Sequence, residues 1–251
     1  MAKTNGRKNG SNGSSNNGTI DLLPNENINN IKEYSSIYGR RVRIKCKNEE
    51  QKEFINLIND NEIVLCNGPA GCGKTYLSIL KSIEYLQQNN NGYNKIFIIT
   101  PNVEISRSLG FLPGSFSDKI SVYMNSIFRL FDKVITEKTR KKLVEENIIE
   151  TLGLSYIRGE NFDNCILIVD EAQNVTKKEM LTILTRIGSN CKMILSGDII
   201  QIDKLNSRNE SGLYYAMEKL KDIKDIGLFT FSNDSIVRND IIRKILDKYV
   251  E

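Results

Sequence analysis

The octapeptide at positions 68–75 constrains this chain more than any other feature. It reads GPAGCGKT and matches the whole phosphate-loop pattern G-x-x-x-x-G-K-[ST]. Glycines let such a loop turn until its N–H groups converge, while Lys74 can reach the β- and γ-phosphates and Thr75 can hold Mg²⁺. An apolar run at 62–66 precedes the loop and helical spacing follows it, as the motif requires. The pattern predicts a nucleoside triphosphate site formed by Gly68, Pro69, Ala70, Gly71, Cys72, Gly73, Lys74, Thr75 and Tyr76.

Short apolar runs predict the strands of a parallel sheet. They lie at 63–66, 95–99, 165–169, 192–195 and 228–231. Such runs are typical of strands that are buried on both faces. Apolar residues at helical spacing predict helices over 120–134, with Ser117 and Asp118 as capping candidates, over 143–152, ended by Gly153, and over 241–249. We therefore expect an α/β fold with a parallel central sheet flanked by helices on both faces.

Two adjacent acids, Asp170 and Glu171, end the apolar run at 165–169. Acids at the carboxyl end of a buried strand are typical of sites where a sheet meets Mg²⁺ and nucleotide. In this interpretation Asp170 holds the Mg²⁺ shell and Glu171 polarises the attacking water. The alternative is that the acids are the N-cap of a helix that begins at Ala172.

Two glutamines are further candidates for nucleotide contacts. Gln201 follows the run at 192–195, where its amide could contact the γ-phosphate or the attacking water. The preceding Gly197 and Asp198 would also suit a simple turn, which is the competing interpretation. Gln51 lies about a dozen residues before the first strand, a position from which an amide could pair with adenine.

The amino-terminal part of the chain separates into two segments. Residues 1–18 are mostly Asn, Gly and Ser with three basic residues, which predicts a disordered basic arm. Residues 19–48 form an extension whose end, 41–47, alternates between basic and apolar side chains. As a strand, 41–47 would present Arg41, Arg43, Lys45 and Lys47 on one face. That face would suit nucleic-acid phosphates, or it would protect the edge of a sheet.

Composition narrows the chemistry further. The 251 residues include no histidine, so carboxylates must do any general-base work. The five cysteines contain no C-x-x-C pair, which argues against a zinc site or a disulfide framework. The formal charge of +4 permits a nucleic-acid partner without requiring one. No apolar run is long enough to span a membrane, so we expect a cytoplasmic protein.

Taken together, these motifs resemble the PhoH family of P-loop ATPases, which is related to superfamily 1 helicases. The resemblance runs from about Gln51 to Ile245 and rests on the phosphate loop together with PNVE at 101–104, LGFLPG at 109–114, YIRG at 156–159, DEAQN at 170–174, LTRIG at 184–188, GDIIQID at 197–203, SGL at 211–213 and VR at 237–238. It implies a single RecA-like domain over 49–251 that binds ATP, with Gln51 reading adenine and Gln201 sensing the γ-phosphate.

Members of the family are similar to ring-forming ATPases, so the resemblance implies a homo-oligomer, with a hexameric ring as one form. Arg158, Arg186 and Arg238 then become candidates for an arginine finger supplied across a subunit interface, although each would also suit a structural ion pair. Thr100 and Asn239 stand where relatives commonly have Arg and His. The missing Arg weakens the expectation that this segment grips a nucleic-acid phosphate.

The function expected from these features is Mg²⁺-dependent ATP hydrolysis coupled to single-stranded RNA or DNA. The alternative is a nucleotide-gated interaction or assembly module with slow hydrolysis and no nucleic-acid role. A small-molecule kinase fits less well, because the sequence shows no acceptor-binding lid. The thiol of Cys72 lies among N–H groups beside Lys74, which predicts a reactive thiolate, with an inert packing residue as the alternative.

Overall fold

A computed structural model describes residues 41–88, 90–101, 116–203, 205, 207–237 and 248, and the side chains among these except at 116–123. The basic arm at 1–18, most of the extension at 19–48, the motif at 109–114 and Arg238 lie outside the described residues. So does the helix expected over 241–249, apart from Lys248. In the part of the chain that is described, no helix is both long and apolar enough to cross a membrane.

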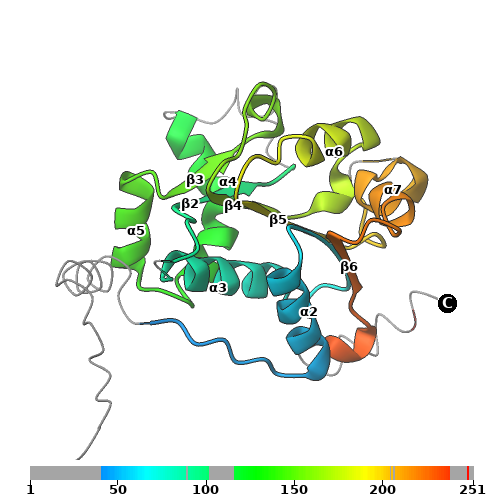
Figure 1. The fold of residues 1–251 in the computed structure, drawn as a ribbon, viewed down its shortest axis with the longest axis horizontal. Helices are drawn as coiled ribbons and strands as arrows, with labels where there is room; N and C mark the ends of the chain where they lie inside the picture. Colours follow the sequence, from blue (N-terminus) through cyan, green and yellow to red (C-terminus); the bar gives the residue numbers. More distant parts are fainter. Residues whose placement is uncertain are drawn as a thin grey trace, which may run out of the picture.

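The centre of the fold is a six-stranded sheet in which every pair of neighbours is parallel (Figure 1). Its order is β3-β2-β4-β5-β1-β6, and its strands are β1 (Ile63–Asn67), β2 (Lys95–Ile99), β3 (Ile149–Leu152), β4 (Cys165–Val169), β5 (Cys191–Gly197) and β6 (Ile226–Thr230). Because the strands are parallel, their carboxyl ends share one edge, where ligands bind in open α/β sheets.

Helices cover both faces of the sheet. The helices α2 (Glu49–Asp60), α3 (Lys74–Leu86), α4 (Phe116–Phe131) and α5 (Glu137–Glu145) lie on one face, and α6 (Lys177–Leu184) and α7 (Gly212–Lys219) on the other. Successive strand residues point to opposite faces. Val64 therefore packs in the core beneath α3, whereas Leu65 packs in the core beneath α6 and α7. The predicted RecA-like P-loop fold, with a parallel sheet between helices, is confirmed.

Short 3₁₀ turns complete the described elements. They are η2 (Leu154–Tyr156), η3 (Ala172–Asn174), η4 (Arg208–Glu210) and η5 (Asn233–Ser235). The helix expected over 120–134 begins earlier, at Phe116, and ends at Phe131, so Ser117 and Asp118 lie inside its first turn.

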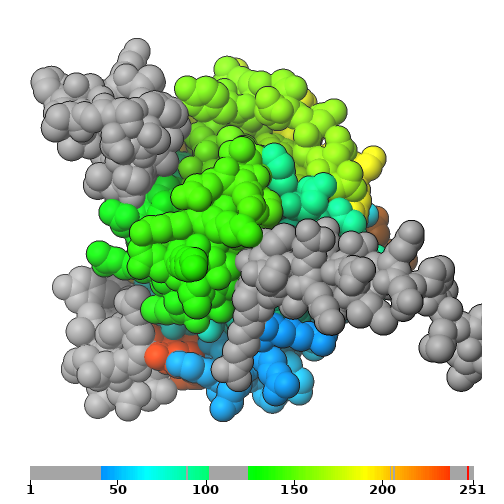
Figure 2. All heavy atoms as spheres, turned by 90° about the vertical axis from the view of Figure 1, so that its left-hand side faces the viewer, coloured from blue at the N-terminus to red at the C-terminus, as the bar shows by residue number. Residues whose placement is uncertain are grey.

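The prediction of a helix over 143–152 is wrong in its second half. Helix α5 ends at Glu145, and β3 follows at the edge of the sheet, paired with β2 through Ile96 and Ile149. The turn between them places Asn147 at φ 54°, a left-handed conformation that Asn tolerates better than most residues. Helical spacing of apolar residues therefore continued by chance into a strand. Figure 2 views the side of the molecule on which α5 lies, and green atoms from this part of the chain fill the middle of that face.

The predicted strand at 41–47 is also wrong, although its alternation of exposure is correct. The segment is extended, with the four basic residues exposed and Val42 buried. It lies beside α3 and pairs with none of the strands that the structure describes. Val42 N donates instead to the Gln87 side chain (2.7 Å), and Lys47 N donates to Gln51 Oε1 (2.8 Å).

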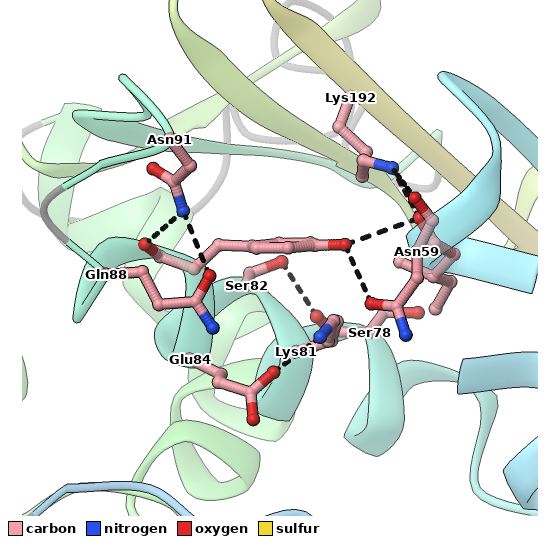
Figure 3. Close-up of polar contacts among 10 residues, drawn as sticks. Asn59, Ser78, Lys81, Ser82, Glu84, Gln88, Asn91 and Lys192 are labelled. Carbon is pink, nitrogen blue, oxygen red and sulfur yellow. Dashed lines mark hydrogen bonds and ion pairs between the residues drawn. The ribbon is translucent and has the colours of Figure 1, made fainter. Parts of the chain in front are cut away.

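A buried polar cluster ties α2, α3 and β5 together at the amino edge of the sheet (Figure 3). We call it the amino-edge cluster and define it as Lys81, Tyr85, Lys192 and the last carbonyls of α2. Lys192 Nζ donates to the carbonyls of Ile58, Asn59 (3.3 Å) and Asn61 (2.6 Å). Burial lowers the pKa of Lys192 to about 8, with Lys81 adding to the effect. The ammonium therefore caps the negative end of the α2 dipole.

Candidate functional site

The phosphate loop joins β1 to α3 and has the backbone that its glycines permit. Gly71 and Gly73 lie at φ 96° and 101°, where a side chain would be strained. At Gly68 a Cβ would come within 2.6 Å of Phe231 Cβ. Helix α3 begins at Lys74, so the N–H groups of its first turn have no acceptor within the helix. Together with the helix dipole, these groups make the loop suitable for an anion.

Lys74 lies within this loop. Its Nζ donates to the carbonyls of Gly68 (2.6 Å) and Pro69 (3.0 Å). The loop carbonyls thus hold the ammonium next to the amino end of α3. A positive charge and the N–H groups of the first helical turn therefore occur together, as a polyphosphate requires.

Asp170 meets the loop across the sheet. Its Oδ1 accepts from Thr75 Oγ1 (2.7 Å) and from Ser196 Oγ (3.3 Å). Burial raises the pKa of Asp170 to about 6, although the bond from Thr75 opposes the shift; nearby Glu171 raises it further, and Lys74 lowers it. The carboxyl is desolvated, and the positive charge of Lys74 does not offset the resulting rise in its pKa. The oxygens of Thr75 and Asp170 are the hard donors that Mg²⁺ prefers, so the residues present fit that ion.

Glu171 stands beside Asp170 in an unusual backbone conformation. Its φ and ψ are 54° and 35°, and its side chain is exposed. The chain leaves β4 here and turns directly into η3. Glu171 occupies the N-cap position of this turn, as the alternative interpretation expected, but its side chain makes no capping hydrogen bond. Its Oε2 accepts instead from Gln173 Nε2 (2.7 Å).

The segment 198–203 lies next to the acids and is held by side chains from neighbouring elements. Asp198 N donates to Gln173 Oε1 (3.1 Å), Gln173 Nε2 donates to the Gln201 carbonyl (3.0 Å), and Ile199 N donates to Asn67 Oδ1 (3.0 Å). Gly197 ends β5, and Ile200 N donates to Asp198 Oδ1 (3.0 Å), so the turn expected at Gly197 and Asp198 begins at Asp198. The Gln201 side chain is exposed at this edge.

Gln51 touches the phosphate loop from the other side. It is buried in the first turn of α2, and its Nε2 donates to the Cys72 carbonyl (2.8 Å). Its Oε1 accepts from Lys47 N. The neighbouring Glu50 accepts from Ser232 N (2.9 Å), which joins α2 to the chain that leaves β6. The structure thus brings Gln51 to the loop.

The two candidate arginines that the structure describes, Arg158 and Arg186, are not brought to the loop. Arg158 is exposed in the turn after η2. The carbonyl of Arg186 accepts from Phe162 N (3.1 Å), close to where β4 begins and so away from the carboxyl edge. Within the described residues, no hydrogen bond or ion pair joins either arginine to residues 68–76.

The predicted thiolate at Cys72 is wrong. The side chain has no exposed surface, and burial raises the pKa of the thiol more than Lys74 lowers it. Cys72 packs in the core beneath α3, so its alternative interpretation, an inert packing residue, fits the structure. The sequence showed the charge beside the thiol but not the burial.

Sequence reasoning gave no role to several polar residues at this edge. Ser196 contacts Asp170, Asn67 holds the segment 198–203, and Gln173 contacts both Glu171 and that segment. Asn67 and Ser196 lie in the last residues of their buried strands, which is the signal that could have identified them.

Comparison with known proteins shows which family this chain is similar to. Residues 43–250 match the family model described as PhoH-like protein. The chain is 37% identical over 211 residues to a PhoH-like protein of Bacillus subtilis (strain 168), covering 84% of this chain and 65% of that protein. It is 31% identical over 208 residues to Protein PhoH of Escherichia coli (strain K12), covering 82% and 58%. It therefore spans about three fifths of the length of the curated relatives it matches.

Solved structures give more distant similarities. The large terminase from a thermophilic bacteriophage has a TM-score of 0.46 at 11% identity, covering 81% of this chain and 50% of that one. Bacteroides Pif1 bound to ssDNA has a TM-score of 0.36 at 16% identity, covering 82% and 46%. The fold assignment rests on the strand order and on the loop after β1.

Proposed function

Since the chain belongs to the PhoH-like protein family, we propose that it binds ATP at residues 68–76 and hydrolyses it with Mg²⁺. We further propose that this cycle acts on single-stranded RNA or DNA, in an assembly of several copies. The observation that best supports the proposed ATP hydrolysis is the 2.7 Å hydrogen bond from Thr75 to Asp170. It joins two motifs that lie 95 positions apart in the sequence, and it puts a hydroxyl and a carboxylate beside the phosphate loop.

Phosphate binding falls to the loop. The first-turn N–H groups of α3 and the Lys74 ammonium take the charge of the β- and γ-phosphates. Thr75 and Asp170 would hold Mg²⁺, which supplies neutralisation of the phosphate charge when it is bound. These residues orient the γ-phosphate towards Glu171.

Hydrolysis requires a base, and Glu171 is the available carboxylate. Water forms a new bond to the γ-phosphorus as the bond to the β–γ bridging oxygen breaks, and the water proton passes to Glu171. Gln201 holds the water or a γ-phosphate oxygen from its exposed position at the same edge. Water is the acceptor, so the reaction is hydrolysis and not transfer to a second substrate.

Gln51 selects adenine. A carboxamide has two N–H donors and two oxygen lone pairs. Gln51 uses one N–H to donate to the Cys72 carbonyl and one lone pair to accept from Lys47 N. The remaining donor and acceptor suit adenine N7 and the N6 amino group. Because the amide also touches the loop, adenine contact and phosphate contact are adjacent.

The nucleic-acid and assembly parts of the proposal depend on other residues. Exposed cations at 41, 43, 45 and 47 are available for phosphate contacts outside the ATP site. An arginine that serves the reaction comes from a neighbouring copy, with Arg158, Arg186 and Arg238 as candidates.

The test is ATP turnover by the purified chain with and without single-stranded RNA or DNA. Lys74→Ala should abolish ATP binding, and Glu171→Gln should retain binding but lose turnover by about 100-fold or more. Lys52→Ala, which changes an exposed lysine of α2, should match the wild type. Wild-type turnover in Glu171→Gln would refute the role of that residue. A rate of ATP turnover that does not change when oligonucleotide is added would favour the nucleotide-gated interaction module instead.

A further inference from the structure

The Gln173 side chain lies at the carboxyl edge and forms hydrogen bonds through both its amide nitrogen and its amide oxygen. It is 1% exposed, lies in η3 and makes three hydrogen bonds. Its Nε2 donates to Glu171 Oε2 (2.7 Å) and to the Gln201 carbonyl (3.0 Å), while its Oε1 accepts from Asp198 N (3.1 Å). Both amide hydrogens are therefore engaged, one by the candidate base and one by the segment that carries the candidate sensor.

The bond to Glu171 fixes an otherwise loosely held group. Glu171 is exposed, and its backbone adopts a left-handed conformation that is uncommon for a residue with a side chain. An exposed glutamate ordinarily samples several rotamers. The Gln173 amide selects one of them, and because Gln173 is buried its own position is set by packing.

The other two bonds tie the same amide to residues 198–201. The fit is close, because a Cβ at Gly197 would collide with Gln173 Oε1 and would lie 2.8 Å from Leu213 Cδ2. Segment 198–203 therefore cannot shift towards η3. A shift away from η3 would either move the Gln173 amide with the segment or break the hydrogen bonds between them. Either event changes how the Glu171 carboxylate is held.

We propose that Gln173 is a positioning residue that links the place of segment 198–203 to the orientation of the Glu171 carboxylate. The inference rests on the proposed ATPase. A γ-phosphate that contacts Gln201 sets the segment, the segment sets the Gln173 amide, and the amide directs Glu171 at the attacking water. Hydrolysis is thereby coupled to the state of the nucleotide without any direct contact between Gln173 and substrate.

The principal test is Gln173→Leu, which retains side-chain volume but removes all three bonds. We expect ATP affinity within about threefold of the wild type and kcat lowered by about 10- to 100-fold, since a small misplacement of a reacting group has effects of this size. The matched control is Gln87→Leu, which also removes an amide that accepts from a backbone N–H, but at the far end of α3. It should leave kcat unchanged.

Two further measurements separate positioning from a structural role. Gln173→Glu keeps the acceptor for Asp198 N but opposes Glu171 with a second carboxylate. Its kcat should therefore recover partly at lower pH, where the new carboxyl becomes protonated. This variant also carries the test if Gln173→Leu does not fold. In addition, Gln173→Leu should have little effect on residual turnover when Glu171→Gln is already present, because the two residues act together.

The outcomes distinguish the inference from the proposed function. A wild-type chain that does not hydrolyse ATP overturns both. A folded Gln173→Leu variant with wild-type kcat, in a chain where Glu171→Gln loses turnover, overturns the inference alone. Effects of the two substitutions that multiply independently overturn it as well.

Discussion

Two buried charged groups, Lys192 and Asp170, lie at opposite edges of the same sheet. Burial shifts the pKa of each, but their hydrogen-bond partners differ. At the amino edge, burial lowers the pKa of Lys192 to about 8; at the carboxyl edge, it raises the pKa of Asp170 to about 6. Burial disfavours the charged form in both cases. Lys192 is nevertheless surrounded by carbonyls of the chain itself, whereas Asp170 faces hydroxyl groups and a second acid.

The difference separates a group whose hydrogen bonds stabilise the fold from one that we propose binds Mg²⁺. Lys192 carries a desolvation cost as well, but its ammonium is a hydrogen-bond donor to carbonyls at the end of α2 that would be left buried without it. Asp170 keeps a desolvation cost that a bound cation would relieve. Substitutions that remove the charge at each place should therefore change stability in opposite directions.

The largest effect is expected for Lys192→Met. The change leaves the carbonyls of Asn59 and Asn61 without this donor and leaves Ile58 only the Tyr85 hydroxyl, so we expect the free energy of unfolding to fall by about 2–4 kcal/mol. Chemical denaturation measures the loss. Lys52→Met, at an exposed ion pair, should change stability by less than about 0.5 kcal/mol. A Lys192→Met protein as stable as the wild type would show that the hydrogen bonds of Lys192 do not stabilise the fold.

A smaller effect of opposite sign is expected for Asp170→Asn. Asn keeps an acceptor for Thr75 but carries no charge, so without nucleotide or Mg²⁺ the variant should be more stable at pH 7.5, on the order of 1–2 kcal/mol. Its ATP turnover should be lost.

The pH dependence of that gain follows from the sign of the pKa shift. The folded pKa of about 6 lies above the unfolded value of about 3.9, so the folded state binds this proton more tightly. The contribution of Asp170 to stability therefore falls as the pH rises from about 4 to about 6. Denaturation of both proteins at pH 4.5 and 7.5 should show the advantage of Asp170→Asn growing with pH. A gain that shrinks with pH would mean that the folded pKa is not raised.

The smallest effect is expected for Tyr85→Phe. The tyrosine hydroxyl donates to Asn59 Oδ1 (3.1 Å) inside the amino-edge cluster, and its loss should lower the free energy of unfolding by about 1 kcal/mol. ATP turnover should stay at the wild-type level, since the cluster and the phosphate loop lie at opposite edges. A marked loss of turnover in a folded Tyr85→Phe protein would show that the two edges are coupled.

Much of the carboxyl edge was accessible to sequence reasoning. The phosphate loop and the acids at 170 and 171 are local patterns, and a parallel sheet necessarily gathers the carboxyl ends of its strands. The five predicted strands overlap β1, β2, β4, β5 and β6, because apolar residues dominate each of these strands. β3 was missed because Glu150 and Thr151 interrupt its apolar residues, which also fit helical spacing.

The amino-edge cluster was not accessible in this way. Lys192 is a single lysine within an apolar run, and its partners are backbone carbonyls more than 130 positions earlier in the chain. Main-chain acceptors leave no trace in a sequence. Gln173 was visible within a motif, but its role depends on distances to Glu171 and to segment 198–203 that only the packed structure sets.

The burial of Cys72 beneath the phosphate loop has a thermodynamic consequence. Because the Cys72 side chain belongs to the core that contains Leu77 and Phe231, the loop that we propose binds a nucleotide is also part of the core of the domain. Occupancy and melting temperature are then linked, and each tenfold excess of a tight ligand over its dissociation constant adds about 1.4 kcal/mol to the folded state. A thermal-shift survey of nucleotides would consequently rank their affinities without any assay of turnover.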